Sequence, residues 1–194
     1  MGISKVGRRR AVFLDRDGTI IRQVELLTRI SKVKILPGAA QAIRVMNKLG
    51  FLVIVVSNQP VVARGLITSA GIERMNQVLA RRLLRQGARI DAFYFCQHHP
   101  KATLKEYRVR CSCRKPGAGM IRKSARDHNI DVRRSFIVGD GVIDVVAGKR
   151  VKLTTILVKS GPGHSRLDKK YNMKPDFVAK NLLAAANIIK KHAK

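Results

Sequence analysis

Tryptophan is absent from this 194-residue sequence, and aromatic residues make up only 5% of it. A surface that stacks single-stranded nucleic acid needs aromatic side chains, so their scarcity argues against a dedicated platform of that kind. Long apolar runs are missing too, since no stretch approaches the roughly 18 consecutive apolar residues of a transmembrane helix. The basic N-terminus leads into only a few apolar residues, which is too short for a secretory signal. We therefore expect a cytoplasmic protein without a membrane span.

Acidic residues are also scarce, with 12 Asp and Glu against 40 Lys and Arg and a formal net charge of +28. Such a field attracts polyanions, among them nucleic acid, acidic lipid headgroups and phosphorylated metabolites. The alternative is a solvated basic surface with no particular partner. Four of the 12 acids, Asp15, Asp17, Asp140 and Asp144, fall in just two short motifs. Random surface placement would rarely concentrate them in this way, so these motifs are the first candidates for chemistry.

The spacing of apolar residues predicts strands that alternate with helices along the chain. Strands are expected at 11–14, 51–56, 92–95, 136–138 and 154–158, and helices at 37–49, 68–86, 117–128, 142–148 and 181–192. This alternation is typical of a doubly wound α/β domain with a mainly parallel sheet. The length fits one domain, 1–194, with a basic arm at 1–10 and no room for a large second domain over the crevice at the strand ends.

Two carboxylates directly follow the first predicted strand, in the order Asp15, Arg16, Asp17, Gly18, Thr19. In open α/β sheets, ligands bind beyond the carboxyl ends of the strands, so Asp15 and Asp17 would project into that crevice. An aspartate placed there can act as a nucleophile and form an aspartyl-phosphate while its neighbour transfers protons. The alternative is that both are solvated turn residues, as Asp beside Gly commonly is.

A third carboxylate, Asp140, ends a later strand, and Asp144 lies one helical turn further on. Carboxylate oxygens are the ligands that hard cations prefer. We expect a magnesium ion held by Asp15, Asp140 and a main-chain oxygen of Asp17. Such an ion would let an anionic nucleophile approach an anionic phosphate.

Three further residues are candidates to hold that phosphate. Ser57 ends the second buried strand and offers a hydroxyl and a backbone N–H, and Asn58 offers its amide. Lys115 stands between an irregular loop and the start of a helix, where it could neutralise phosphate oxygens as charge builds up in the transition state.

All three cysteines fall in one irregular loop, residues 96–113, as Cys96-Gln97-His98 and Cys111-Ser112-Cys113. A Cys-x-His pair followed by a Cys-x-Cys pair provides the ligands of a closed, structural zinc site. We expect Cys96, His98, Cys111 and Cys113 to bind Zn²⁺, with the neighbouring His99 as the competing imidazole. The alternative is three buried cysteines near unrelated histidines.

Taken together, four short motifs resemble those of the haloacid dehalogenase (HAD) superfamily. They are Asp15 to Thr19, Ser57-Asn58-Gln59, Arg114-Lys115-Pro116, and Gly139-Asp140 with Asp144. The stretch Val62-Ala63-Arg64-Gly65 and the Cys/His loop narrow the resemblance to a zinc-containing branch with heptose-bisphosphate and histidinol-phosphate phosphatases. The long gap between His98 and Cys111 is more similar to the heptose-bisphosphate members.

The resemblance implies a capless, magnesium-dependent phosphomonoesterase acting on a small phosphorylated metabolite, most of all a heptose bisphosphate. Asp15 would attack phosphorus, Asp17 would protonate the leaving group and then activate water, and Ser57 and Lys115 would hold the phosphoryl group. Arg114 would contribute to substrate recognition, with Asn58 and Thr19 as further substrate contacts.

Three departures from the family pattern bear on the substrate. Pro60 and Val61 stand where the family has smaller residues, and Gly141 stands where a lysine is common. The segment 21–27 also lacks the polar and aromatic residues that the heptose enzymes present to their sugar. Histidinol phosphate and nucleic-acid phosphates therefore stay open as substrates, as does a non-enzymatic basic binding protein.

Overall fold

The computed structural model describes residues 7–165, 171 and 173–193. Its centre is a six-stranded sheet with the order β3-β2-β1-β4-β5-β6, in which every pairing is parallel. The strands are β1 (Ala11–Leu14), β2 (Leu52–Asn58), β3 (Ala92–Cys96), β4 (Phe136–Gly139), β5 (Thr154–Val158) and β6 (Phe177–Ala179). The predicted doubly wound α/β fold is confirmed.

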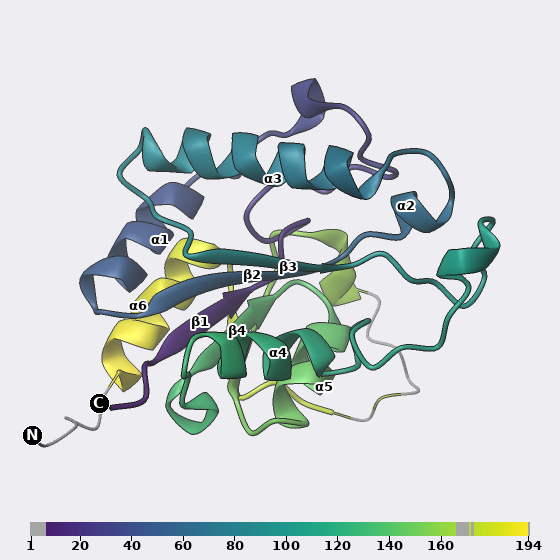
Figure 1. Ribbon diagram of the computed structural model, residues 1–194. Coiled ribbons are helices and arrows are strands. Elements are labelled where there is room, and N and C mark those ends of the chain that lie inside the picture. The colour runs from purple at the N-terminus through teal and green to yellow at the C-terminus, as the bar shows by residue number, and fades with distance from the viewer. Residues whose placement is uncertain (1–6, 166–170, 172, 194) are drawn as a thin grey trace, which may run out of the picture.

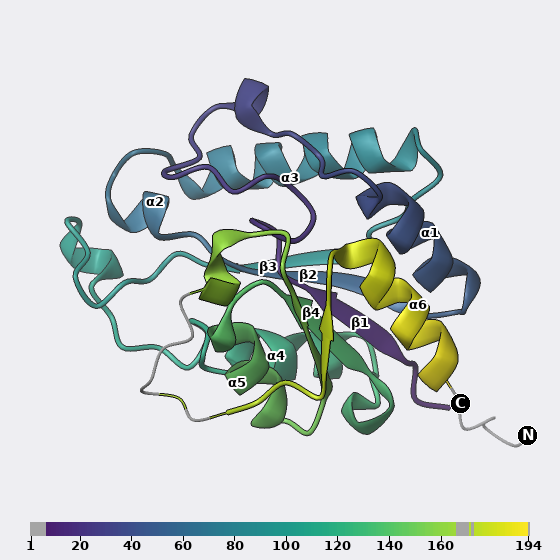
Figure 2. The same cartoon turned by 180° about the vertical axis from the view of Figure 1, so that it is seen from behind.

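Helices cover both faces of this sheet. One face carries α1 (Ala39–Lys48), α3 (Ser69–Leu84) and α6 (Leu182–His192), and the other carries α4 (Gly119–Asp127) and α5 (Val142–Lys149). Figure 1 shows α3 along one side of the sheet with α4 and α5 on the other, and Figure 2 shows α1 beside α6 from behind. All strands run the same way, so their carboxyl ends meet at one edge.

Strand β1 shows why its sequence reads as one continuous apolar run. Val12 and Leu14 pack into the core under α1, α3 and α6, whereas Ala11 and Phe13 pack into the core under α4 and α5. All four side chains are 0% exposed. A strand with a helix layer on each face has no solvent-facing side, so polar residues first appear where the strand ends.

Two short elements depart from the predicted pattern. Pro60–Ala63 forms a one-turn helix, α2, with the proline at its first turn, where its missing N–H costs no hydrogen bond. Strand β6 has only three residues and lies at the sheet edge, where Val178 is 51% exposed. Residues 97–118 contain no strand, and their only helical element is a 3₁₀ turn at Lys105–Tyr107, in agreement with the irregular loop that was expected.

The described part of the basic arm contacts the domain. Arg9 forms a bridge to Ile130, and the Arg10 guanidinium lies 4.6 Å from the ring centroid of Phe51. Residues 1–6 of the predicted arm lie outside the described residues. None of the described helices is both long and apolar enough to cross a bilayer.

Candidate active site

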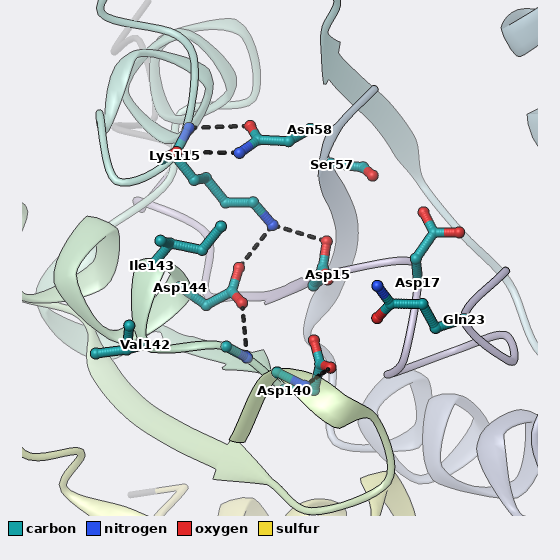
Figure 3. Close-up of a pocket in the computed structure, with 12 residues that line it drawn as sticks. Asp15, Asp17, Gln23, Ser57, Asn58, Lys115, Asp140, Val142, Ile143 and Asp144 are labelled. Carbon is teal, nitrogen blue, oxygen red and sulfur yellow. Dashed lines mark hydrogen bonds and ion pairs between the residues drawn. The ribbon is translucent and has the colours of Figure 1, made fainter. Parts of the chain in front are cut away.

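A crevice of about 290 Å³ opens at the carboxyl edge of the sheet. Asp15 directly follows β1, Ser57 and Asn58 end β2, and Asp140 directly follows β4, so three neighbouring strands each deliver polar groups to it. Figure 3 shows these side chains around the opening, with Lys115 reaching in from the opposite loop. The first turn of α5 completes the wall with Val142, Ile143 and Asp144, and Asp17, Gln23, Gly141 and Gly163 also line the crevice.

Lys115 is the central cation of the crevice. Its Nζ donates to Asp15 Oδ1 at 2.7 Å, to Asp144 Oδ1 at 2.6 Å and to the Val56 carbonyl at 2.8 Å. All three ammonium donors are therefore used, and the side chain is almost fully buried. Burial favours the neutral amine, but the carboxylates of Asp144 and Asp15 outweigh it and raise the pKa of Lys115. The lysine is a fixed positive charge at neutral pH.

The pKa values of the surrounding carboxylates are raised too, which for an acid disfavours the charged form. Burial raises the pKa of Asp15 to about 7 against the attraction of Lys115, and the charges of Asp144 and Asp17 raise it further. Burial and the charge of Asp15 raise the pKa of Asp140 to about 6, and burial also raises the pKa of Asp144. One ammonium does not balance this many buried carboxylates, so the site is short of positive charge.

Carboxylate oxygens of Asp15, Asp140 and Asp144 lie within 4.8 Å of one another. Three closely spaced carboxylates that share a single ammonium, that of Lys115, are suited to a divalent cation such as Mg²⁺. Asp15 and Asp140 belong to the predicted magnesium site. The third carboxylate of the cluster is Asp144 rather than Asp17, although Asp144 also accepts from Lys115 and from the Gly141 N–H.

Asp17 is held by a buried polar network on the other side of the crevice. Its Oδ2 accepts from Arg16 Nε at 3.0 Å and from Gln59 Nε2 at 3.0 Å. Arg16 is 2% exposed and also donates to Gln59 Oε1 and to Asn76 Oδ1, which lies on α3. Gln59 Nε2 lies 2.6 Å from Ser57 Oγ as well. The network fixes the direction of the Asp17 carboxylate relative to the strand that carries Asp15.

Sequence reasoning missed this network. Arg16 and Gln59 lie inside the motifs named above, but the sequence alone indicates no role for either, and Asn76 lies outside all of those motifs. A polar residue among the apolar positions of α3 was the one available clue, because Asn76 is only 6% exposed. Its partner can be recognised only when the fold brings residues 16 and 76 together.

Of the three predicted substrate contacts, Thr19 and Arg114 lie outside the crevice and Asn58 lines it. Asn58 lines the crevice, but its amide donates to the Lys115 carbonyl and its Oδ1 accepts from the Lys115 N–H, so the side chain holds a loop (Figure 3). Thr19 is fully buried and does not line the crevice. Arg114 does not line it either, because its guanidinium donates to the His98 carbonyl at 3.2 Å. Asn58 is therefore the one of the three that faces the crevice, with both polar atoms of its amide bonded to the main chain of Lys115.

The departures from the family pattern are accommodated locally. Pro60 starts the short helix α2 and Val61 is buried, and neither lines the crevice. Gly141 does line it, and a Cβ there would meet Asp144 Oδ2 at 3.4 Å, an ordinary contact distance. Segment 21–27 contributes one polar side chain to the crevice, that of Gln23.

Gly18 is the position where the turn after β1 requires glycine. Its φ is +82°, and a Cβ would lie 2.5 Å from Asp140 Oδ2. Both the backbone conformation and the close approach exclude a side chain. The absence of that side chain lets the ends of β1 and β4 come together, which brings Asp15 beside Asp140.

The predicted zinc ligands also come together. Ligand atoms of Cys96, His98, Cys111 and Cys113 lie within 4.8 Å of one another. The Sγ atom of Cys113 is 3.0 Å from that of Cys96, 2.8 Å from that of Cys111 and 3.4 Å from His98 Nδ1. Three thiols and one imidazole around a common centre fit a closed zinc site, which leaves no position for a catalytic water.

The surroundings of this cluster favour metal binding and settle the choice of histidine. The Arg114 N–H donates to Cys111 Sγ at 3.4 Å, as groups around a bound metal commonly do. Against the effect of burial, hydrogen bonds from Cys113 and Arg114 lower the pKa of Cys111 to about 6, whereas burial raises the pKa of Cys96 and of Cys113. His99 turns away, with its Nδ1 accepting from the Lys101 N–H. His98 is thus the imidazole of the cluster, as predicted.

Comparisons with known proteins agree with this architecture. A family model described as HAD-hydrolase-like matches residues 112–185. The D-glycero-beta-D-manno-heptose-1,7-bisphosphate 7-phosphatase of Rhodopseudomonas palustris is 42% identical over 142 residues, which are 73% of this chain and 79% of that protein. The protein of the same name from Escherichia coli K12 is 38% identical over 153 residues, 78% of this chain and 80% of that protein.

A solved structure of a heptose-bisphosphate phosphatase is similar to this chain in three dimensions. The D,D-heptose 1,7-bisphosphate phosphatase from B. bronchiseptica, complexed with magnesium and phosphate, superimposes with a TM-score of 0.83. It is 28% identical in sequence, and the superposition covers 95% of this chain and 99% of that one.

Proposed function

Because this chain belongs to the HAD-like phosphatases, in the branch of the D-glycero-β-D-manno-heptose-1,7-bisphosphate 7-phosphatases, we propose that it removes phosphate from a heptose bisphosphate. The observation that carries the proposal is the contact of Asp15 with the buried Lys115 at the strand edge, beside Asp140. A nucleophile, a fixed cation and a second metal-ligating carboxylate are the groups that phosphoryl transfer through an aspartate needs.

In the first step a carboxylate oxygen of Asp15 forms a bond to phosphorus, and the bond from phosphorus to the sugar oxygen breaks. Asp17 gives its proton to that sugar oxygen, which leaves as an alcohol. In the second step Asp17 takes a proton from water, the water oxygen attacks the aspartyl-phosphate, and Asp15 and inorganic phosphate are released. The bonds from Arg16 and Gln59 support this role because they orient the Asp17 carboxylate.

Lys115 and Ser57 hold the phosphoryl group in this mechanism. The ammonium of Lys115 lies 2.7 Å from Asp15, so it stands beside the attacking group and stabilises charge on the phosphoryl oxygens. Ser57 lines the same crevice from the end of β2. Asn58 acts through Lys115, because both polar atoms of its amide hold the main chain of that residue.

We propose that Asp15, Asp140 and the main-chain oxygen of Asp17 hold Mg²⁺, and that Asp144 positions Lys115 and the turn at Gly141. Bound Mg²⁺ supplies positive charge that lets the Asp15 carboxylate approach an anionic phosphate. The B. bronchiseptica relative contains magnesium together with phosphate. The surplus of buried carboxylates in this chain supports the same cofactor.

The test is hydrolysis of p-nitrophenyl phosphate by purified protein with and without added magnesium. We expect magnesium-dependent turnover that falls at least about a thousandfold in Asp15→Asn. Asp127→Asn is the matched control, because Asp127 lies on the far end of α4, where it accepts from Lys123 and Tyr94. Full activity in Asp15→Asn would show that Asp15 is not the nucleophile.

The substrate is tested by comparing kcat/KM for D-glycero-β-D-manno-heptose 1,7-bisphosphate with kcat/KM for histidinol phosphate. We expect a clear preference for the heptose bisphosphate, because the curated relatives carry that activity in their names. A preference for histidinol phosphate would move the chain to the other activity of the branch.

The net charge of +28 keeps a nucleic-acid phosphate as the second candidate. Salt separates the two, because a polynucleotide contacts many cations and loses affinity steeply as salt rises. The assay compares KM at about 50 mM and about 200 mM salt, and a KM that changes little between the two supports the sugar phosphate. A cytoplasmic location stays a prediction.

A further inference from the structure

A second cavity, of about 610 Å³, lies at the amino ends of the strands, whereas the crevice lies at their carboxyl ends. It is formed by the C-terminal half of α4, by the turns that precede β4 and β5, and by the segment that precedes β1. Helix α5 runs between the two sites, with Asp144 in its first turn at the crevice and Arg150 just beyond its last turn at this cavity. With a rise of 1.5 Å per residue, the six residues from Asp144 to Arg150 place the two sites roughly 9 Å apart along the helix.

Five cationic side chains surround this cavity: Arg8, Arg122, Arg126, Arg150 and Lys152. No carboxylate is among its lining residues in the described part of the chain. The charges come from three separate segments, so the fold rather than the local sequence gathers them. Arg122 and Arg126 are four residues apart on α4, where like charges repel and slightly destabilise the helix.

The floor of the cavity is apolar. Ala125, Ile130, Val132 and Val151 line it, and all four belong to or pack against the core between the sheet and α4 and α5. The volume lies within the usual range of small-molecule sites, about 300–1,000 Å³. A cationic rim above an apolar floor is complementary to a ligand with several negative charges and an organic body.

Two of the cations are positioned in a way that simple solvation does not require. Arg150 donates to the Pro116 carbonyl at 2.9 Å, which fixes one cation of the rim and ties it to the loop that carries Lys115. Lys152 has a φ of +64°, a conformation that glycine adopts at lower cost. Among the described residues only Leu26, Asn129 and Lys152 adopt a positive φ without being glycine, and Asn129 and Lys152 both line this cavity.

Helix C-termini favour nearby cations, which by itself accounts for Arg126 and Arg150. It does not account for Arg122, which lies within α4, or for Arg8, which precedes β1. We propose that this cavity is a binding site for an organic polyphosphate, a small molecule with several linked phosphate groups on an apolar body. The charge of such a ligand, about −4 for a nucleoside triphosphate, matches the cations around the cavity.

The test is a calorimetric titration of the full chain with ATP in magnesium-free buffer. The pocket variant is Arg122→Gln with Arg126→Gln, and the control is Arg81→Gln with Arg85→Gln, which removes the same charge from the exposed end of α3 on the other face of the sheet. We expect ATP affinity to fall at least about tenfold in the pocket variant and less than about threefold in the control, because charge-assisted hydrogen bonds are lost only in the first.

Lys152→Gly provides a second variant with an independent readout. The substitution removes one cation and relieves the backbone at φ +64°, so we expect a higher melting temperature together with weaker ATP binding. A merely structural role of Lys152 would not produce this combination.

Equal loss of affinity in the pocket variant and the control would overturn the proposal, because it would mean attraction by net charge alone. Unchanged ATP affinity in the pocket variant would overturn it too, since the ligand would then bind elsewhere, the crevice included. Displacement of ATP by a short DNA duplex that depends on the same arginines would replace it with a nucleic-acid surface. None of these outcomes bears on hydrolysis at Asp15.

Discussion

Removing a carboxylate from the crevice should stabilise the protein when magnesium is absent. Burial and the charge of Asp15 raise the pKa of Asp140 to about 6 from an ordinary value of 3.8. A group whose pKa is raised by folding contributes stability below its unfolded pKa and loses that contribution as the pH rises through its folded pKa. At 1.36 kcal/mol per pKa unit, ionised Asp140 costs the metal-free fold up to about 3 kcal/mol at pH 7.5.

Asp140→Asn removes this cost and keeps the local geometry. The Asn Oδ1 can still accept from the Gly163 N–H, as Asp140 Oδ2 does at 2.9 Å. We expect the free energy of unfolding of the metal-free variant to exceed that of the wild type by ~1–3 kcal/mol at pH 7.5, a rise in melting temperature of about 5 °C. The difference should shrink at pH 4.5, where the wild-type carboxyl is largely protonated.

The assay is thermal unfolding followed by circular dichroism, after dialysis that removes magnesium while metal analysis confirms that zinc is retained. Magnesium should then raise the melting temperature of the wild type and of Asp127→Asn, but not that of Asp140→Asn, because a ligand that binds only the folded state stabilises it. A lower melting temperature for Asp140→Asn at pH 7.5 without magnesium would refute the charge-surplus reasoning. An equal response of both variants to magnesium would refute the site.

Three shorter predictions test other parts of the structure. Arg16→Met leaves the buried amide oxygens of Gln59 and Asn76 without a donor and removes one of the two donors to Asp17, so urea unfolding should show a loss of ~2–4 kcal/mol and steady-state kinetics a lower kcat with little change in KM. Cys113→Ser should lose bound zinc on dialysis, as measured by metal analysis, because one of four ligands is gone. Asp176→Ala should cost ~1–3 kcal/mol in urea unfolding with turnover unchanged, because the buried N–H and hydroxyl of Thr155 lose their acceptor.

The sequence predicted five of the six strands and missed β6, the short strand at one edge of the sheet. Strands such as β2 are runs of apolar residues that stop at a polar end, because helices cover both of their faces. Strand β6 is three residues long and lies at the edge, so Val178 faces solvent and no continuous apolar run marks it. The pairing of Ala179 with Val158 defines this strand, and that contact is not local in sequence.

Site residues could likewise be predicted where a local sequence pattern marks them, and not where only the fold brings them together. Asp15 and Asp140 could be predicted because strand order places the ends of β1 and β4 side by side, and the cysteines because their spacing is local. Arg16 could not, because one buried arginine among 40 basic residues looks like a surface charge until Asn76 and Gln59 meet it. The position of Asn58 at a strand end predicts a ligand contact, whereas in the structure its amide bonds the main chain of Lys115.

That contact explains why an irregular loop can carry the cation of the site. Lys115 has no helix or strand to hold it, so its backbone must be fixed by other means. Asn58 bonds both main-chain groups of Lys115, and the Cys/His cluster ends two residues before it, with Arg114 bonded to Cys111 and to His98. These contacts place the ammonium within 2.7 Å of Asp15, and a phosphoryl group stabilised by preorganised charge needs that precision more than it needs flexibility. In the proposed mechanism the zinc cluster therefore acts by positioning Lys115 and takes no part in the reaction.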